Sequence, residues 1–267
     1  MPDDARLDLT KPSAARLYDH YLGGKHHYPV DEEFAARVVA LCPFTPDLAI
    51  YNRGFLTRAV EALVSAGIRQ FIDVGSGIPT APNVHQIAHA TAPDSRVVYV
   101  DFDGEAIATA QRELAGEPHA TMIHGDLRRP ETILDNPVLH GMLDLTEPVG
   151  LLLVAVLNFV APGDEPHALV ARYLDALPSG SHLVASHVSV EEATEEARRQ
   201  LRAGQEAYGS TPLPSTARSK EEFTRFFAGL DLFDPGVSFA ADWRAVKPVA
   251  ADDPARPCFY AAVGRKP

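Results

Sequence analysis

The feature that most constrains this chain is an apolar segment that ends near an acid and runs directly into a glycine-rich turn. The segment is Gln70-Phe71-Ile72-Asp73-Val74, and Gly75-Ser76-Gly77-Ile78-Pro79 follows it. A helix is predicted behind the turn, over residues 80–91. Strand, glycine turn and helix in this order are typical of the start of a nucleotide-binding βαβ unit, because glycine admits backbone angles that a Cβ forbids. The pattern predicts a ligand lying directly against this turn.

Two further predicted strands also end in acids. Residues 96–101 end at Asp101, with Asp103 two positions later, and residues 120–124 are followed by Gly125 and Asp126. An acid at the tip of the second strand of such a unit can accept hydrogen bonds from the ribose hydroxyls of a nucleoside. Because ligands of open α/β sheets bind at the carboxyl ends of the strands, we expect these side chains to lie at one binding edge.

The remaining pattern alternates strands and helices. Three amphipathic helices are expected before the first strand, over residues 10–19, 31–42 and 47–66. Later strands are expected over residues 148–157, 181–187, 232–242 and 258–264, and later helices over residues 130–134, 167–177, 190–208 and 219–230. This order predicts a doubly wound, mostly parallel, seven-stranded α/β sheet of the Rossmann-like type. We expect a helical extension or cover over residues 1–66 and a ligand-binding domain over residues 67–267.

Composition narrows the class of partner. The 267 residues are 46% hydrophobic, enough for a large core, and carry a formal charge of −12. This balance argues against nucleic acid as the main partner, because phosphate binding needs clustered Lys and Arg. No apolar run has the length of a membrane span, and the start of the chain has no signal-peptide pattern, so we expect a cytoplasmic protein without a membrane partner. Cys42 and Cys258 form no metal motif and are expected to be reduced and buried, and no metal site is predicted.

The details of the turn separate two cofactor classes. A dinucleotide fingerprint has a third glycine three residues after the second, and here residues 78–80 are Ile, Pro and Thr. Instead, Asp73 precedes Gly75 and Gly77 in a D-x-G-x-G pattern. With the acids after the next two strands, this pattern resembles the class I S-adenosylmethionine-dependent methyltransferases.

Motifs outside the turn narrow the resemblance to one family. They are Pro12-Ser13-Ala14-Ala15-Arg16, Tyr21-Leu22-Gly23-Gly24-Lys25, Asn52-Arg53-x-Phe55-Leu56, the run 151–160, Ser186-His187, Pro235-Gly236-Val237 and Trp243-Arg244. Together they resemble an actinobacterial family of S-adenosyl methyltransferases that was once catalogued as a domain of unknown function. The similarity covers nearly the whole chain, and it implies S-adenosylmethionine as the cofactor without implying a particular acceptor.

The resemblance also implies roles for individual residues. Gly75 and Gly77 are expected to lie against the methionine end and ribose of the cofactor, and Asp73 to order the turn. Asp101 is the expected ribose ligand, with Asp103 as the alternative. The remaining cofactor contacts are expected from Asp126 and Leu127 at the adenine, from Asn158 and Phe159 on the floor of the site, and from Arg53 or Lys25 at the cofactor carboxylate.

The chemistry of methyl transfer asks for a positioned acceptor and, where the acceptor is protonated, a base. The candidate bases are His187 at a strand end and His26, His27 and Tyr28 in the glycine loop between the first two helices. We expect this loop to act as a lid in which Tyr21, Lys25 and the three loop candidates face the methyl group. The loop can equally be a solvated turn, and the helices a layer packed on one face of the sheet.

The function predicted from the sequence is a methyltransferase that uses S-adenosylmethionine and acts on a small molecule. Two alternatives stay open: a binding or regulatory module that keeps the cofactor site without catalysis, and a nicotinamide-dependent oxidoreductase on the same sheet. The missing third glycine counts against the oxidoreductase. The oligomeric state is not predicted from the sequence.

Overall fold

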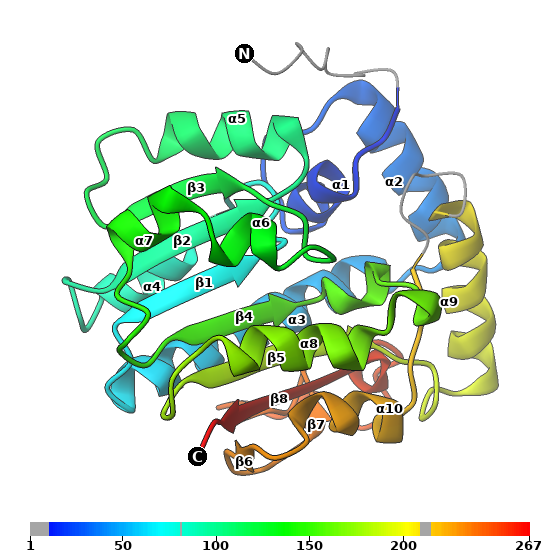
Figure 1. Cartoon of the computed structure of the whole chain (residues 1–267). Coiled ribbons are helices and arrows are strands. Elements are labelled where there is room, and N and C mark those ends of the chain that lie inside the picture. Colours follow the sequence, from blue (N-terminus) through cyan, green and yellow to red (C-terminus); the bar gives the residue numbers. More distant parts are fainter. Residues whose placement is uncertain (1–10, 81, 209–214) are drawn as a thin grey trace.

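A single mixed β-sheet forms the centre of the computed structural model, which describes residues 11–80, 82–208 and 215–267. Its strands are β1 (Gln70–Val74), β2 (Arg96–Asp101), β3 (Ala120–His124), β4 (Gly150–Val154), β5 (His182–Val188), β6 (Asp231–Leu232), β7 (Ser238–Phe239) and β8 (Phe259–Arg265). The strand order is β3-β2-β1-β4-β5-β8-β6, and β7 also pairs with β8. Strands β1 to β5 pair in parallel, and β8 runs antiparallel to β5, β6 and β7. The predicted mostly parallel α/β sheet is confirmed (Figure 1).

Helices cover both faces of this sheet (Figure 1). They are α1 (Ala14–Tyr21), α2 (Pro29–Leu41), α3 (Thr45–Ser65), α4 (Val84–His89), α5 (Gly104–Glu113), α6 (Glu131–Leu134), α7 (Pro137–Met142), α8 (Pro166–Asp175), α9 (Glu195–Tyr208) and α10 (Lys220–Thr224). Four short 3₁₀ segments join them: η1 (Leu157–Phe159), η2 (Pro162–Asp164), η3 (Arg225–Phe227) and η4 (Arg256–Cys258).

The central strands are apolar on both faces because each face packs against a helical layer. Successive residues alternate between the two layers, as the two-residue period of a strand requires. Ile72 and Leu151 face the core shared with α6, α7, α8 and α10, whereas Phe71 and Leu152 face the core shared with α3, α4 and α5. All four side chains are fully buried.

The N-terminal helices divide into two groups. Helix α3 lies in the sheet's own core, where Phe55 and Leu63 pack with Phe71. Helices α1 and α2 share a smaller cluster of Leu17, Phe34, Ala35 and Val38. Among the described residues, no single helix is long and apolar enough to cross a membrane, although α2 and α3 pass that test as a pair bent by 101°.

Some predicted boundaries are shifted, for local reasons. The helix expected from residue 80 begins at Val84, because Asn83 caps it with Gln86 and two prolines precede it. The strand expected over residues 232–242 consists of β6 and β7, which the turn at Pro235-Gly236 separates. Helix α7 was not predicted, and Thr10 lies outside the described residues.

Candidate functional site

The glycine turn after β1 has the backbone geometry that its sequence predicts. Gly75 and Gly77 have φ angles of 72° and 65°, in the left-handed region that glycine enters without strain. The Gly75 N–H donates to the Val100 carbonyl at 2.8 Å. A Cβ on Gly75 would lie 2.3 Å from Val156 Cγ2, so only glycine fits where the turn meets the end of β4.

Asp101 joins the turn to the tip of β2. Its Oδ2 accepts from the Gly77 N–H at 2.8 Å and its Oδ1 from the Asp103 N–H at 2.9 Å. Burial raises the pKa of Asp101, and these backbone hydrogen bonds oppose the rise. The carboxylate therefore lies at the strand tip beside the glycine turn, where the side chain that binds the ribose of the cofactor is expected.

Asp103 has a different set of partners. Its Oδ1 accepts from the Glu105 and Ala106 N–H groups at the start of α5, at 2.8 and 3.3 Å. Its Oδ2 accepts from the Ser13 hydroxyl at 3.2 Å. Asp103 is thus the N-cap of α5, which leaves Asp101 as the better placed of the two predicted ribose ligands.

Asp73 is a buried acid in β1, just before the glycine turn. Burial raises the pKa of Asp73 to about 7, Arg53 opposes this rise and Asp101 adds to it. The Arg53 guanidinium donates to the carbonyls of Thr80 and Pro82. These bonds hold the segment behind the glycine turn, so Arg53 is engaged with the protein as well as being a candidate for the cofactor carboxylate.

Several buried polar atoms around this edge have no partner within the described residues. They are Arg53 Nε, Ser76 Oγ and Asn158 Oδ1. Buried polar atoms are nearly always satisfied in native proteins. Two donors and an acceptor left open around a turn that admits close backbone approach fit a polar ligand with a carboxylate, an amino group and hydroxyls. The residues present therefore fit S-adenosylmethionine.

The predicted adenine contacts lie after β3. Asp126 binds Arg128 through Nε at 2.9 Å and Nη2 at 2.8 Å, and its pKa is lowered because these hydrogen bonds outweigh its partial burial. Leu127 is buried, and its carbonyl accepts from the Tyr173 hydroxyl at 2.9 Å. The adenine roles of Asp126 and Leu127 stay predictions.

The structure does not bring the four candidate bases together. His187 is fully buried, and burial lowers its pKa to about 4. Its Nδ1 bonds to the Val188 carbonyl and its Nε2 to Arg218. Because both nitrogens are engaged, the geometry does not support His187 as a base that meets a substrate.

The loop candidates face helices α2 and α5. His26 Nε2 lies 2.8 Å from Glu113 Oε1, at the last residue of α5, and His27 Nε2 lies 3.2 Å from Glu32 Oε1. Glu113 is eight residues, roughly 12 Å, along α5 from Glu105. Tyr28 is 38% exposed, and a hydrogen bond to Glu105 raises its pKa. The catalytic roles of these loop side chains stay predictions.

Sequence reasoning missed Asp19, which organises this loop. Its carboxylate is buried and accepts from the Thr80 hydroxyl at 2.8 Å and from the His26 N–H at 2.8 Å. It thereby ties α1 to the segment behind the glycine turn. An acid on the buried face of a short amphipathic helix, four residues before two glycines, was the available signal.

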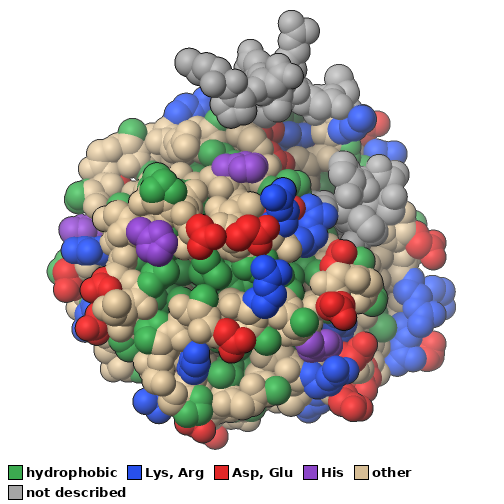
Figure 2. All heavy atoms as spheres, in the orientation of Figure 1, with side chains coloured by type: hydrophobic (Ala, Val, Ile, Leu, Met, Phe, Trp, Pro, Cys, Tyr) green, Lys and Arg blue, Asp and Glu red, His purple; other side chains and the backbone are tan. Residues whose placement is uncertain are grey.

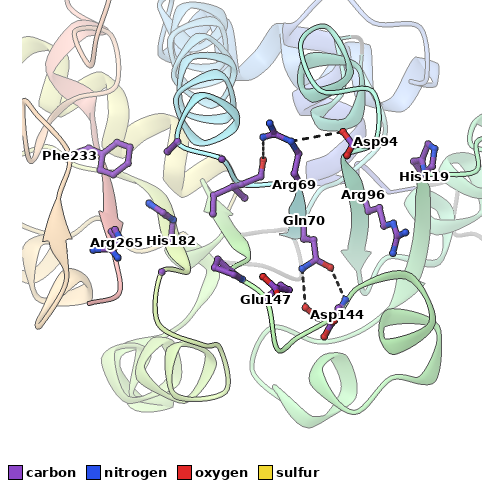
Figure 3. Close-up of a pocket in the computed structure, with 15 residues that line it drawn as sticks. Arg69, Gln70, Asp94, Arg96, His119, Asp144, Glu147, His182, Phe233 and Arg265 are labelled. Atoms are coloured by element: carbon purple, nitrogen blue, oxygen red, sulfur yellow. Dashed lines mark hydrogen bonds and ion pairs between the residues drawn. The ribbon is translucent and has the colours of Figure 1, made fainter.

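A separate cavity of about 660 Å³ lies at the opposite edge of the sheet, near the amino ends of β1, β2 and β5 (Figure 3). Its three arginines already have protein partners among the lining or adjacent residues: Arg69 pairs with Asp94, Arg96 with the Met142 carbonyl and Arg265 with Asp231. The glycine turn and the strand-end acids do not line it. This cavity is therefore distinct from the candidate site.

Comparison with known proteins shows the family to which the chain belongs. The model of the S-adenosyl methyltransferase family matches residues 2–267. The chain belongs to this family. A duf574 family protein from Streptomyces avermitilis is 38% identical to this methyltransferase, with a TM-score of 0.90, over 98% of this chain and 100% of that one. A protein from Thermobifida fusca described as a candidate methyltransferase is 35% identical, with a TM-score of 0.90, over 97% and 96% of the two chains.

A more distant solved structure shows the fold alone. The N-methyltransferase NodS from Bradyrhizobium japonicum, in complex with S-adenosyl-L-homocysteine, is 13% identical with a TM-score of 0.50, over 94% of this chain and 99% of that one. No curated protein matches the chain. Family membership establishes a methyltransferase that depends on S-adenosylmethionine, and neither alternative from the sequence gains support.

Proposed function

We propose that this methyltransferase acts on a small-molecule acceptor that binds at the carboxyl edge of the sheet, beside the glycine turn. S-adenosylmethionine supplies a methyl group that its sulfonium already activates. The protein's own contribution is to hold the two reactants in line and to keep water away from them. The observation that carries the proposal is the position of α1 directly over the glycine turn.

Three contacts fix α1 in that position. Ala15 Cβ lies 3.7 Å from the place of a Cβ on Gly77. Asp19 binds Thr80 behind the turn, and Ser13 binds Asp103 beside it. We propose on this basis that α1, together with α2 that packs on it, covers the ligand edge, whereas α3 packs on one face of the sheet. A covered edge excludes bulky acceptors and favours a small molecule, and the Gly23-Gly24 loop allows the cover to open for entry.

Charge supports the same class of acceptor. On the face in Figure 2, acidic and basic side chains of the described residues are interspersed, so this face carries no continuous basic surface for nucleic-acid phosphates. We further propose a cytoplasmic location, because Cys42 and Cys258 are buried and free, as expected in a reducing compartment.

Two measurements test the proposal in sequence. Calorimetry with S-adenosylmethionine, S-adenosylhomocysteine and NAD establishes the ligand, and heat with NAD alone would overturn the cofactor site. Incubation with isotopically labelled cofactor and fractionated metabolite extracts then looks for label in small products. Label found only in protein or nucleic-acid fractions would refute a small-molecule acceptor, and cofactor binding without label in any fraction would favour the binding module.

A further inference from the structure

The residue after β4 has a strained backbone. Ala155 has a φ angle of 55°, in the left-handed region that non-glycine residues rarely occupy. Strained residues of this kind persist only where the surrounding structure holds them, and they cluster at functional sites. Ala155 lies at the carboxyl edge of the sheet, and the side chain of its neighbour Val156 lies against Gly75.

A buried chain of hydrogen bonds holds Ala155. Its N–H donates to Ser186 Oγ at 3.0 Å, and the Ser186 hydroxyl donates to Asn52 Oδ1. Asn52 Nδ2 donates to the Tyr18 hydroxyl at 2.9 Å, and that hydroxyl donates to the Ala49 carbonyl at 3.3 Å. The Asn52 side chain and the Ser186 side chain are buried, at 1% and 0% exposure.

The direction of this chain follows from its first donor. The Ala155 N–H can only donate, so Ser186 Oγ accepts there and has its own proton left for Asn52. The Asn52 amide must then turn its oxygen to Ser186 and its nitrogen to Tyr18. Each of the three side chains, Ser186, Asn52 and Tyr18, is both donor and acceptor in one consistent sequence, and bonds arranged in this way strengthen one another.

The chain joins four elements of the site. Tyr18 belongs to α1, Asn52 to α3 and Ser186 to β5, and Ala155 follows β4. These hydrogen bonds therefore connect α1, which we propose covers the ligand edge, to the segment after β4, in which the Val156 side chain lies against Gly75.

We propose that Tyr18, Asn52 and Ser186 are positioning residues that hold Ala155 in its left-handed conformation and thereby set the shape of the cofactor site beside Gly75. Because Tyr18 lies on α1, the same chain couples the docking of the cover to that shape. The proposal rests on the proposed function, in that it takes the carboxyl edge as the cofactor site.

The chain offers a matched control at the other end of the same two strands. Ser181 is fully buried, and its Oγ accepts from the Val149 N–H at 3.1 Å, just before β4. Ser186→Ala and Ser181→Ala therefore each remove a bond from a backbone N–H to a buried serine hydroxyl, at opposite edges of the sheet. Only the first is expected to alter the ligand edge.

The test is calorimetry with S-adenosylhomocysteine on the full chain, with thermal unfolding measured on every variant. Ser186→Ala is expected to weaken binding about tenfold, because the Ala155 N–H keeps only its longer bond to the Ser186 carbonyl at 3.3 Å and the buried Asn52 Oδ1 loses its donor. Ser181→Ala is expected to change it less than about twofold, because its bond lies outside the ligand edge. Adding Ala155→Gly to Ser186→Ala is expected to recover most of the affinity, because glycine adopts the left-handed angle without help.

A serine that served only packing would give no such rescue. Equal losses for both serine variants, or no recovery with Ala155→Gly, overturn the proposal while leaving the methyltransferase function intact. Absence of binding by the unmodified chain overturns the proposed function and this inference together. If Ser186→Ala does not fold, Tyr18→Phe interrupts the chain at its far end, and faster hydrogen exchange of the Ala155 amide is then the expected result. An unchanged exchange rate refutes the coupling.

Discussion

The buried ion cluster around Arg16 gives a direct test of the cover. Arg16 Nε binds Asp31 at 2.6 Å, and its Nη1 binds Glu105 on α5. The three side chains are 4%, 0% and 9% exposed. Replacing Arg16 by Met keeps an unbranched apolar stem and removes the charge that both carboxylates share.

The expected loss follows from what the two carboxylates retain. Removing one partner of a buried ion pair destabilises a protein by about 3–5 kcal/mol, because a buried charge is left uncompensated. Asp31 keeps backbone donors from Ser13 at 3.1 Å and Tyr28 at 2.9 Å, and Glu105 keeps the Tyr28 hydroxyl. We therefore expect a loss near the lower limit, about 3 kcal/mol in the free energy of unfolding by urea.

The control and the second readout separate stability from function. Arg37→Met removes an exposed arginine on α2 that stacks on Phe34, and it should cost less than about 1 kcal/mol. In the unmodified protein, the amides of residues 22–30 should gain protection from hydrogen exchange when S-adenosylhomocysteine binds, and Arg16→Met should reduce this gain. A loss below about 1 kcal/mol would contradict the buried cluster. Lost stability with unchanged affinity and protection would refute α1 as a cover.

Three further tests, with five variants, concern the ligand edge. Asp101→Ala should weaken binding of S-adenosylhomocysteine by about 1.5–3 kcal/mol in calorimetry. Asp103→Ala should mainly remove a helix cap worth about 1 kcal/mol of stability. A larger loss of affinity for Asp103→Ala than for Asp101→Ala would assign ribose binding to Asp103. Gly75→Ala should abolish binding because of its φ of 72° and the clash with Val156, while Gly163→Ala, with no atom within 4 Å, should bind normally. The pKa of Asp73 is raised to about 7, so between pH 4 and 7 Asp73 keeps its proton in the folded protein and loses it in the unfolded chain. The free energy of unfolding should therefore fall by about 1.4 kcal/mol per pH unit from pH 4 towards 7. Asp73→Asn should remove this slope. An unchanged slope in Asp73→Asn would place the titrating group elsewhere.

The parts of the fold that local patterns determine were predictable. Strands β1, β2, β4 and β5 are runs of apolar residues that alternate between two helical layers, and such runs have few other stable arrangements. The glycine turn and Asp101 came together because parallel strands share one edge. These features depend on residues that are close in sequence or on the rules of sheet topology.

The contacts of several candidate site residues were not predictable, because their partners are distant in sequence. His187 is a titratable residue at a strand end, and burial lowers its pKa to about 4, an effect to which the charge of Arg218, 31 residues later, adds. Ser186 gains its role from Asn52, which is 134 residues away. His26 turns to Glu113 because Asp19 holds its backbone.

The glycine pair after α1 shows how one tertiary contact explains a local motif. Gly23 has a φ of 77° and open space around it, so its requirement is the backbone angle alone. A Cβ on Gly24, by contrast, would lie 1.9 Å from Asp19 Oδ1, so its requirement is the close approach of the loop to that carboxylate. The same carboxylate binds Thr80 behind the glycine turn. The second glycine is therefore required because the loop wraps around the residue that ties α1 to the segment behind that turn.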